Sequence, residues 1–534
     1  MYIMMAYLTN VWKLGFTRAA AILNVFWGLV ATLPLLLKFL VDTLIGHYWM
    51  LLISSISYTV GLGFLSMSTP PVLAKAMGTC SEYKPECIGN GQQILFYTGL
   101  ALVVIGGCGH ITSWAQFASE QINEEEEEIK NGTRCCNCFG LYTVIITTIV
   151  AVIVLSYVKL WSIRFGIPAI CSLVATLLFF SGSRTYKYVS PQGSPLTAFV
   201  RVFVASTTKV FYALPKDVSK LYEYENSDTE VAPHTKSLRC LDKAAIIEPS
   251  KTLEEQRKNR WRLCTVTEVE ESKTIVRMIP VWLTFIFCGV VSSIGFTYFI
   301  EQLDNLNPKV GRLEFPAIVL LWFYNQAKTI CNELYVYFTN SLGQSGSRKF
   351  APAIGIVLSM ISAVLCCIVA ANVENRRLNV VQKHGLLDKP DETIPMTMFW
   401  LLPQFLLLAA LDGLFYSSAL SFFKDQSPVS IEKYLPFFIG GVYGVGILSS
   451  VLSVYIVGKI SESGGKPNWF QHNLNRSRLD KYYRTLAWLS AINLVIFIVV
   501  AIFYRYKESN LQNLEAEEFI EADEPFSDDN TCCC

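Results

Sequence analysis

This chain of 534 residues contains little charge. Asp, Glu, Lys and Arg make up 16% of it, against about 25% in an average soluble domain, and 52% of its residues are hydrophobic. The formal net charge of +1 offers neither a basic surface for nucleic acid nor a bulk charge for an acidic partner. The composition therefore argues against a nucleic-acid-binding protein and against a soluble globular protein.

Sequence motifs of catalysis and metal binding are also missing. There is no P-loop, no nucleophile elbow and no zinc-protease motif. Cys135, Cys136 and Cys138 have a C-x-x-C spacing without a second pair, so we expect no zinc there. The sixteen cysteines are scattered and do not form a disulfide framework. The sequence therefore predicts neither an enzyme nor a resident cofactor.

A cleavable signal peptide is not evident either. Residues 1–10 are apolar, but they have no basic n-region and no small-residue cleavage site. We interpret them as the last turns of a helix whose beginning is absent from this chain.

Long apolar stretches are what the chain has in abundance. A helix of about 20 apolar residues crosses the bilayer core, and a helix satisfies its own backbone groups in hydrocarbon. The sequence therefore predicts an all-α membrane protein with about eleven complete transmembrane helices plus an N-terminal stub. The expected spans are 18–41, 48–69, 93–118, 140–159, 165–183, 276–299, 315–338, 351–372, 396–422, 434–458 and 484–504.

Polar segments divide the chain into four parts. We expect an N-terminal bundle at 1–185, a central loop at 186–275, a C-terminal bundle at 276–507 and an acidic, disordered tail at 508–534. The central loop is rich in Lys and Arg, which favours the cytosolic side, and its run at 254–273 is typical of an amphipathic helix lying along the membrane face.

This topology places the loop at 70–92 outside. Cys80 and Cys87 lie seven residues apart in that loop. They either pair, as an oxidising compartment permits, or stay free.

Several runs carry a family resemblance that extends over nearly the whole chain. The last outside loop and final helix at 469–507 resemble those of the plant nitrate/peptide transporter family, a proton-dependent oligopeptide transporter branch of the major facilitator superfamily. The runs NLNRSRLD and DKPDETIPM resemble its fifth plant subgroup. The other runs are FLVDTLIGHY at 39–48, GSPLT at 193–197, RCLDKAA at 239–245, WRLCTVTEVEE at 261–271 and FFKDQSP at 422–428.

The resemblance implies a fold and a function. It implies two six-helix bundles that rock around a central site, and proton-coupled symport of a small anionic or zwitterionic solute: nitrate, a peptide, a hormone or a glycoside. Ser421 replaces a glutamate that peptide-binding members often carry, which argues against classical di- and tripeptides. The partners would be the solute, protons and the lipid bilayer of the plasma or vacuolar membrane.

One departure from the family supports an alternative. The family's first helix carries an E-x-x-E-R/K motif that couples protonation to binding, and this sequence begins after the place where that motif would end. The alternative is therefore an uncoupled facilitator, or a non-transporting membrane sensor or scaffold.

Ionisable groups inside apolar spans are candidates for the solute and proton pathway. His110 is either a proton carrier or a neutral helix-contact residue. Lys328 and Glu333 lie about 140° apart on a helix, whereas Asn332 lies one turn from Lys328. Asp412 could relay a proton, bind a cation or pair with a base on a neighbouring helix.

A second group of candidates lies at a short turn between two spans. Asp42 and Gly46 match the family's cytosolic turn, where a carboxylate can latch the gate. His47 stands where the family usually has Arg, and is a titratable partner. Lys38 is interpreted as a lysine that extends its charged end toward the membrane face.

Overall fold

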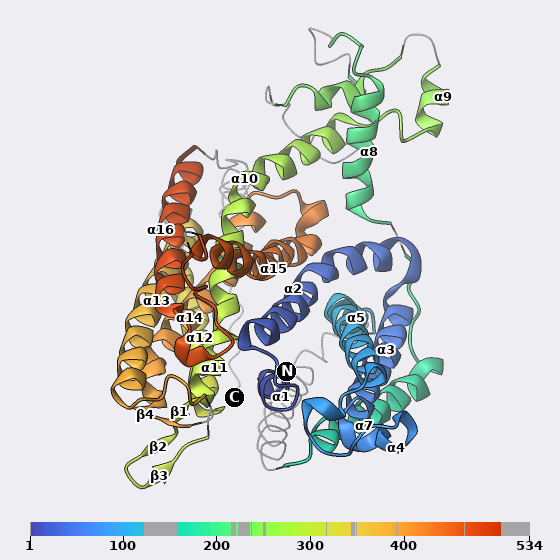
Figure 1. Cartoon of the computed structure of the whole chain (residues 1–534). Helices are drawn as coiled ribbons and strands as arrows, with labels where there is room; N and C mark the ends of the chain where they lie inside the picture. The colour runs from blue at the N-terminus through green and yellow to red at the C-terminus, as the bar shows by residue number, and fades with distance from the viewer. Residues whose placement is uncertain are drawn as a thin grey trace, which may run out of the picture.

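The computed structural model shows two helix bundles with a smaller subdomain beyond them (Figure 1). The expected span at 140–159 and the tail at 508–534 lie outside the described residues. The structure describes residues 2–121 and 158–503, with short gaps at 192, 215–220, 223–234, 236–237, 249–251, 317, 343–347, 349, 391 and 464.

The N-terminal bundle packs its helices through glycines. Helix α3 lies against α5 and α7, and α2 lies against α5. A Cβ atom on Gly61 of α3 would lie 2.8 Å from the carbonyl oxygen of Gly99 on α5, so the two backbones touch. The helices are α1 (Tyr2–Asn10), α2 (Phe16–Leu40), α3 (His47–Met67), α4 (Pro70–Met77), α5 (Asn90–Glu120) and α7 (Trp161–Ser181).

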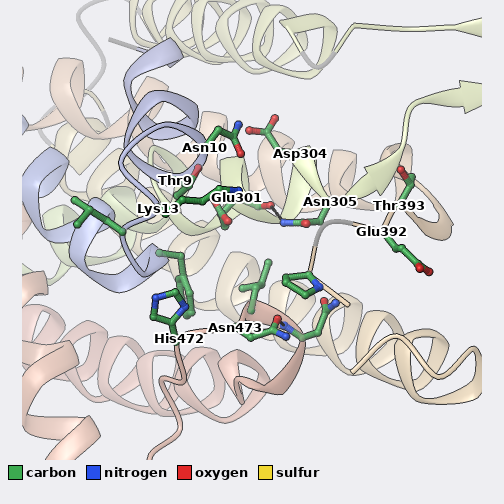
Figure 2. Close-up of a pocket in the computed structure, with 15 residues that line it drawn as sticks. Thr9, Asn10, Lys13, Glu301, Asp304, Asn305, Glu392, Thr393, His472 and Asn473 are labelled. Carbon is green, nitrogen blue, oxygen red and sulfur yellow. Dashed lines mark hydrogen bonds between the residues drawn. The ribbon is translucent and has the colours of Figure 1, made fainter. Parts of the chain in front are cut away.

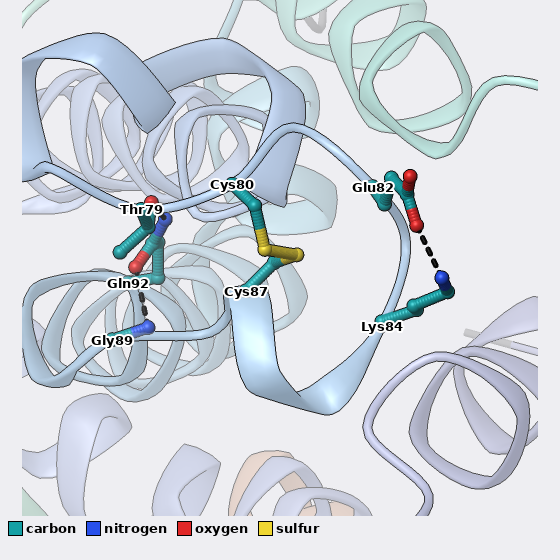
Figure 3. The surroundings of a disulfide bond; sticks show 7 residues. All are labelled: Thr79, Cys80, Glu82, Lys84, Cys87, Gly89 and Gln92. Carbon is teal, nitrogen blue, oxygen red and sulfur yellow. Dashed lines mark hydrogen bonds and ion pairs between the residues drawn. A yellow bond between two sulfur atoms is a disulfide. The ribbon is translucent and has the colours of Figure 1, made fainter.

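The loop between α3 and α5 holds a disulfide. Cys80 and Cys87 are bonded, with their Cα atoms 4.8 Å apart (Figure 3). Gln92 ties the end of this loop, because its side chain accepts from the backbone N–H of Gly89 and donates to Thr79. Of the two readings of the cysteine pair, the structure has the bonded one.

The C-terminal bundle follows the same plan. Helices α10, α12, α13, α14, α15 and α16 pack together, and two small two-stranded pairings join their outer loops, β1 with β4 and β2 with β3. Its elements are α10 (Val266–Gly295), α11 (Tyr298–Asp304), β1 (Leu306–Asn307), β2 (Lys309–Val310), β3 (Leu313–Glu314), α12 (Ile318–Ser341), α13 (Ala351–Lys383), β4 (Ile394–Thr397), α14 (Leu402–Lys424), α15 (Leu435–Ser461) and α16 (Leu479–Phe503).

Within the described ranges, nine helices are long and apolar enough to cross a membrane. Helix α12 has 24 residues but is less apolar, because polar side chains repeat along one face. The prediction of an all-α membrane protein with two helix bundles is confirmed. Several helices extend past the predicted spans, α13 to Lys383 for example, because hydropathy marks only the part in hydrocarbon.

A central subdomain lies beyond the ends of both bundles (Figure 1). Lys273 is fully buried in it and pairs with Asp242 at 2.5 Å and with Glu270 at 2.7 Å. The RCLDKAA and WRLCTVTEVEE runs therefore meet in one folded unit. Its helical segments are α8 (Pro195–Thr208), the 3-10 turn η5 (Leu241–Ala245), α9 (Leu253–Lys258) and the first turns of α10.

The prediction of one amphipathic helix over the run at 254–273 is wrong. Helix α9 ends early in that run, and α10 starts afresh where Thr265 and Glu268 form a capping box. The break arises because Cys264 is buried and donates its backbone N–H to Ala244 at 3.2 Å. A continuous helix would pull this residue out of the subdomain core.

The two bundles meet along α2 and α15. A Cβ atom on Gly28 of α2 would lie 2.5 Å from a Leu448 carbon and 3.1 Å from the carbonyl oxygen of Gly444, both on α15. Small residues thus allow the two helices to approach closely. This contact is called the seam below.

Candidate functional site

A cavity of about 550 Å³ lies in the C-terminal bundle, where that bundle faces α2 across the seam. The seam helices contribute one wall, through Ala31 of α2 and Ile439, Gly440 and Tyr443 of α15. The other helices of the C-terminal bundle contribute the remaining residues: Ser292, Phe296, Asn325, Lys328, Thr329, Asn332, Asp412, Gly413, Phe415, Tyr416 and Ser417. It is mostly aromatic and polar, with one cation and one carboxylate.

The carboxylate of Asp412 is surrounded by hydroxyl groups. Tyr324 donates to Oδ2 at 2.6 Å, Ser292 donates to the same oxygen at 3.2 Å, and Tyr443 donates to Oδ1. Asp412 lies in the middle of α14, and Gly413 beside it lets α12 approach: a Cβ there would lie 2.4 Å from the carbonyl oxygen of Lys328. Charge-assisted hydrogen bonds of this kind stabilise a buried carboxylate without a cation.

Helix α12 presents a polar stripe to the cavity. Asn325, Lys328, Thr329 and Asn332 recur at helical spacing and all line it. Asn332 accepts a hydrogen bond from Ser417 of α14. Lys328 has no hydrogen bond or ion pair to any other residue in the described part of the chain. The cavity therefore presents an ammonium group whose charge is not already neutralised.

Two predicted pathway residues lie elsewhere. Glu333 is exposed and does not line the cavity. This agrees with the sequence prediction that Glu333 and Lys328 lie on different faces of one helix. His110 lies in a separate cavity of about 200 Å³ between α3, α5 and α7, where its Nε2 is 3.2 Å from Ser55 Oγ. The structure thus brings together Lys328, Asn332 and Asp412 and leaves the other two apart.

At the end of the seam nearest the central subdomain, Asp42 connects the bundles. Tyr434 is the residue directly before α15. Its hydroxyl donates to Asp42 Oδ2 at 2.6 Å and lies 2.7 Å from Ser194 Oγ. Lys38 pairs with Oδ1 at 2.8 Å, and His47 Nε2 lies 3.7 Å from that oxygen. Lys38 is buried, so its interpretation as a lysine extending to the membrane face is wrong.

The backbone of this turn depends on Gly46. It has φ +77°, a left-handed conformation that favours glycine, and it starts α3 directly after the π-helical turn that holds Asp42. Its N–H closes that turn by donating to the carbonyl of Val41 at 2.9 Å. Gly46 therefore lets the turn that holds Asp42 lead directly into α3.

A second interbundle cavity, of about 480 Å³, lies at the opposite end (Figure 2). Helix α1 and the loop after it form one side, and α11 with the loops around Glu392 and His472 forms the other. Figure 2 shows Asn10 and Asp304 pointing toward one another across it. The sequence did not predict this second cavity, because its residues lie in loops and at helix ends rather than inside apolar spans.

Sequence reasoning also missed the tyrosines. Tyr324 and Tyr443 contact the carboxylate of Asp412, and Tyr434 contacts that of Asp42, yet tyrosine on an apolar helix is usual in cores and at membrane interfaces. Tyr324 of α12 and Tyr443 of α15 meet at Asp412 only through the packing of their helices, and Tyr434, in the 3-10 turn before α15, meets Asp42 across the seam. One sequence does not contain that information.

Two helix bundles that meet along a seam, with a cavity at the seam that holds one cation and one carboxylate, define the class: a membrane carrier with the major facilitator fold. Comparison with known protein families gives the same class. Residues 48–469 match the model of the POT family, PTR2, and this chain belongs to that family. It is a family of membrane transporters for small solutes, so the protein is a transporter and not an enzyme.

Relatives extend along nearly the whole chain. Arabidopsis thaliana Protein NRT1/PTR FAMILY 5.5 is 38% identical over 522 residues, covering 97% of this chain and 96% of the relative. Protein NRT1/PTR FAMILY 8.1 of the same species is 29% identical, covering 89% and 85%. The predicted resemblance to the plant nitrate/peptide transporters, and to their fifth subgroup, is confirmed.

Solved structures support the fold. An autoinhibited POT family peptide transporter aligns with TM-score 0.61 at 16% identity, covering 95% of this chain and 94% of that one. A POT family transporter in complex with 5-aminolevulinic acid aligns with TM-score 0.57 at 10% identity, covering 94% and 92%.

Proposed function

We propose that this protein is a proton-coupled carrier for a small solute with an anionic group, either an anion or a zwitterion, and that it works by alternating access. The observation that carries the proposal is the unpaired ammonium of Lys328 in a cavity whose carboxylate, Asp412, is already held by three hydroxyl donors. An anionic solute can therefore bind Lys328 without displacing an internal ion pair. Asn325 and Asn332 offer amide groups on the same stripe.

Asp412 is the proposed proton-binding group. While ionised, it accepts from all three hydroxyls; once protonated, it is itself a donor, and the hydroxyl that faces its proton must accept instead of donating. Tyr443 lies on a seam helix and Tyr324 on α12, so that change acts on both walls of the cavity. Protonation is in this way linked to the packing of the seam.

Asp42 and Gly46 are the proposed gate. The hydrogen bond between Asp42 and Tyr434 closes the end of the seam next to the central subdomain. Opening to that side requires this bond to break while the pair of Asp42 with Lys38 stays within the N-terminal bundle.

Uptake into proteoliposomes tests the proposal. Labelled nitrate, a dipeptide, a carboxylated hormone and a glycoside are offered at acidic and neutral external pH. We expect uptake of one of them to rise as the outside is acidified. A protein that is correctly inserted yet moves none of the four would contradict carriage of this solute class and favour the scaffold alternative.

Variants on one helix then test the site. Lys328→Ala should lower kcat/KM about tenfold or more, since a hydrogen bond to a charged group contributes about 1.5–3 kcal/mol. Glu333→Gln removes a charge from the same helix outside the cavity and should leave uptake unchanged. Asp412→Asn should abolish the pH dependence while solute exchange continues. Equal effects of the Lys328 and Glu333 variants would refute the assignment of the cavity.

A further inference from the structure

The central subdomain exposes a cluster of basic and aromatic side chains that none of the transport steps uses. We call it the basic–aromatic patch. It consists of the turn after α9 and the end of α8, with Lys258, Arg260, Trp261, Arg262, Phe211 and Tyr212 all exposed.

The two halves of the patch are joined through one backbone carbonyl. Lys209, at the end of α8, donates from Nζ to the carbonyl of Ala244 at 3.3 Å, and the N–H of Cys264 donates to the same oxygen at 3.2 Å. Phe211 follows Lys209 by two residues, and Arg262 precedes Cys264 by two. The end of α8 and the turn after α9 are therefore both anchored on η5.

The patch lacks partners that would explain its composition. Lys258, Arg260 and Arg262 form no ion pair with any described residue, and α9 exposes its acidic Glu254 and Glu255 only in its first turn. Phe211 is 98% exposed and Trp261 47% exposed. Exposed aromatic residues beside arginine are typical of interaction surfaces.

The chain contains a segment of opposite character. After Lys507 the sequence has no Lys or Arg, and it carries nine carboxylates between Glu508 and Asp529. Apolar side chains alternate with these acids: Leu511, Leu514, Phe519, Ile520 and Phe526. An acidic and aromatic segment matches a basic and aromatic patch in both charge and apolar contact.

We propose that the C-terminal tail, residues 508–531, docks on the basic–aromatic patch. Helix α16 ends at Phe503, at the end of its bundle near the subdomain (Figure 1). The 31 residues beyond it can extend roughly 100 Å at about 3.3 Å per residue, more than twice the length of α16 itself. Tethering gives the tail an effective concentration on the order of millimolar, so even weak pairing suffices.

An anionic bilayer is the other surface such a patch could bind. Figure 1 shows α8 and α9 beyond the ends of the bundle helices, which places the patch away from the hydrocarbon-spanning segments. The tail, in contrast, is present on every molecule. The structure therefore favours the tail as occupant.

Photo-crosslinking in the full chain tests this. Phe519 is replaced by p-benzoyl-phenylalanine, the protein is placed in nanodiscs containing phosphatidylserine, and linked peptides are identified by mass spectrometry. We expect links within one chain to the turn at 258–262 and to residues 210–212. An added synthetic peptide of residues 508–531 should compete for the patch and reduce these links.

Two charge-reversal variants form a matched pair. Arg260→Glu with Arg262→Glu should lower the crosslink yield about tenfold, since each exposed ion pair contributes up to about 1 kcal/mol and both change sign. Arg312→Glu with Lys466→Glu makes the same change at exposed outer-loop positions without a described ion-pair partner and should leave the yield unchanged. Thermal unfolding verifies that both variants are folded.

Three results would overturn the proposal. Links to lipid, together with loss of phosphatidylserine-vesicle binding in the Arg260/Arg262 variant, would show that the patch faces the bilayer. Links between two chains would make it a contact between copies. An equal yield in both charge-reversal variants would show that the patch is not the docking surface.

Discussion

The hydrogen bond between Tyr434 and Asp42 should set the stability of the closed gate. The variant Tyr434→Phe removes the hydroxyl that donates at 2.6 Å and leaves Asp42 paired with Lys38. A hydrogen bond to a charged group contributes about 1.5–3 kcal/mol. The Asp42 side chain is 16% exposed and water can partly replace the lost donor, so we take the lower value. That corresponds to about a tenfold shift toward the open gate.

Distances between spin labels measure that shift. Labels at Leu44 and Val429, which are 72% and 85% exposed on opposite sides of the gate, report the separation of the bundles in a background without accessible cysteines. Tyr434→Phe should move the distance distribution toward longer values. The matched control is Tyr482→Phe, which loses a hydrogen bond of 2.8 Å to Ser453 inside one bundle. An unchanged distribution, or the same change in the control, would refute a gate at Asp42.

Three further predictions concern stability and chemistry away from the gate. Gly289→Ala should lower the Tm, because its Cβ would lie 2.1 Å from a backbone carbonyl of α15, whereas Gly63→Ala meets open space and should not; a fluorescence melt compares them. Glu374→Gln should destabilise the fold by roughly 3–5 kcal/mol, since it leaves the buried guanidinium of Arg377 without its carboxylate, and denaturant titration should show it. Burial raises the pKa of the Cys264 thiol to about 12, so maleimide should not label it at neutral pH until the central subdomain unfolds; mass spectrometry of the labelled peptides checks this.

The sequence predicted the membrane helices well and the ends of several elements poorly. Apolar length is a local property, so each predicted span in the described ranges has its helix. The break at Cys264 could not be predicted in this way. It depends on a hydrogen bond to Ala244, twenty residues away, and on burial in a subdomain that no local pattern marks.

The candidate site was predictable to the extent that charge inside an apolar span is rare. Lys328 and Asp412 stood out for that reason, and Asn332 followed from its spacing on the helix. His110 satisfied the same criterion, yet it lies in another cavity, because rarity marks a polar group without saying which neighbours it faces. The Tyr434 contact joins residues 392 apart in sequence, and nothing local predicts it.

The distribution of polar contacts is consistent with the proposed alternating access, in which each bundle moves as a rigid unit. The pair of Glu374 with Arg377 is fully buried inside one bundle, where its loss is costly. At the seam the contact is mostly between small residues, which pack closely but impose little directional preference. Gly444→Ala would place a methyl group 2.5 Å from Thr32 Oγ1 and 2.8 Å from the carbonyl oxygen of Gly28. This steric clash would increase the separation of α2 and α15 at the seam. Because the clash acts between bundles, the spin-label distance should lengthen while the Tm changes little. A large fall in Tm without a longer distance would mean that the seam belongs to the core of the fold and does not open.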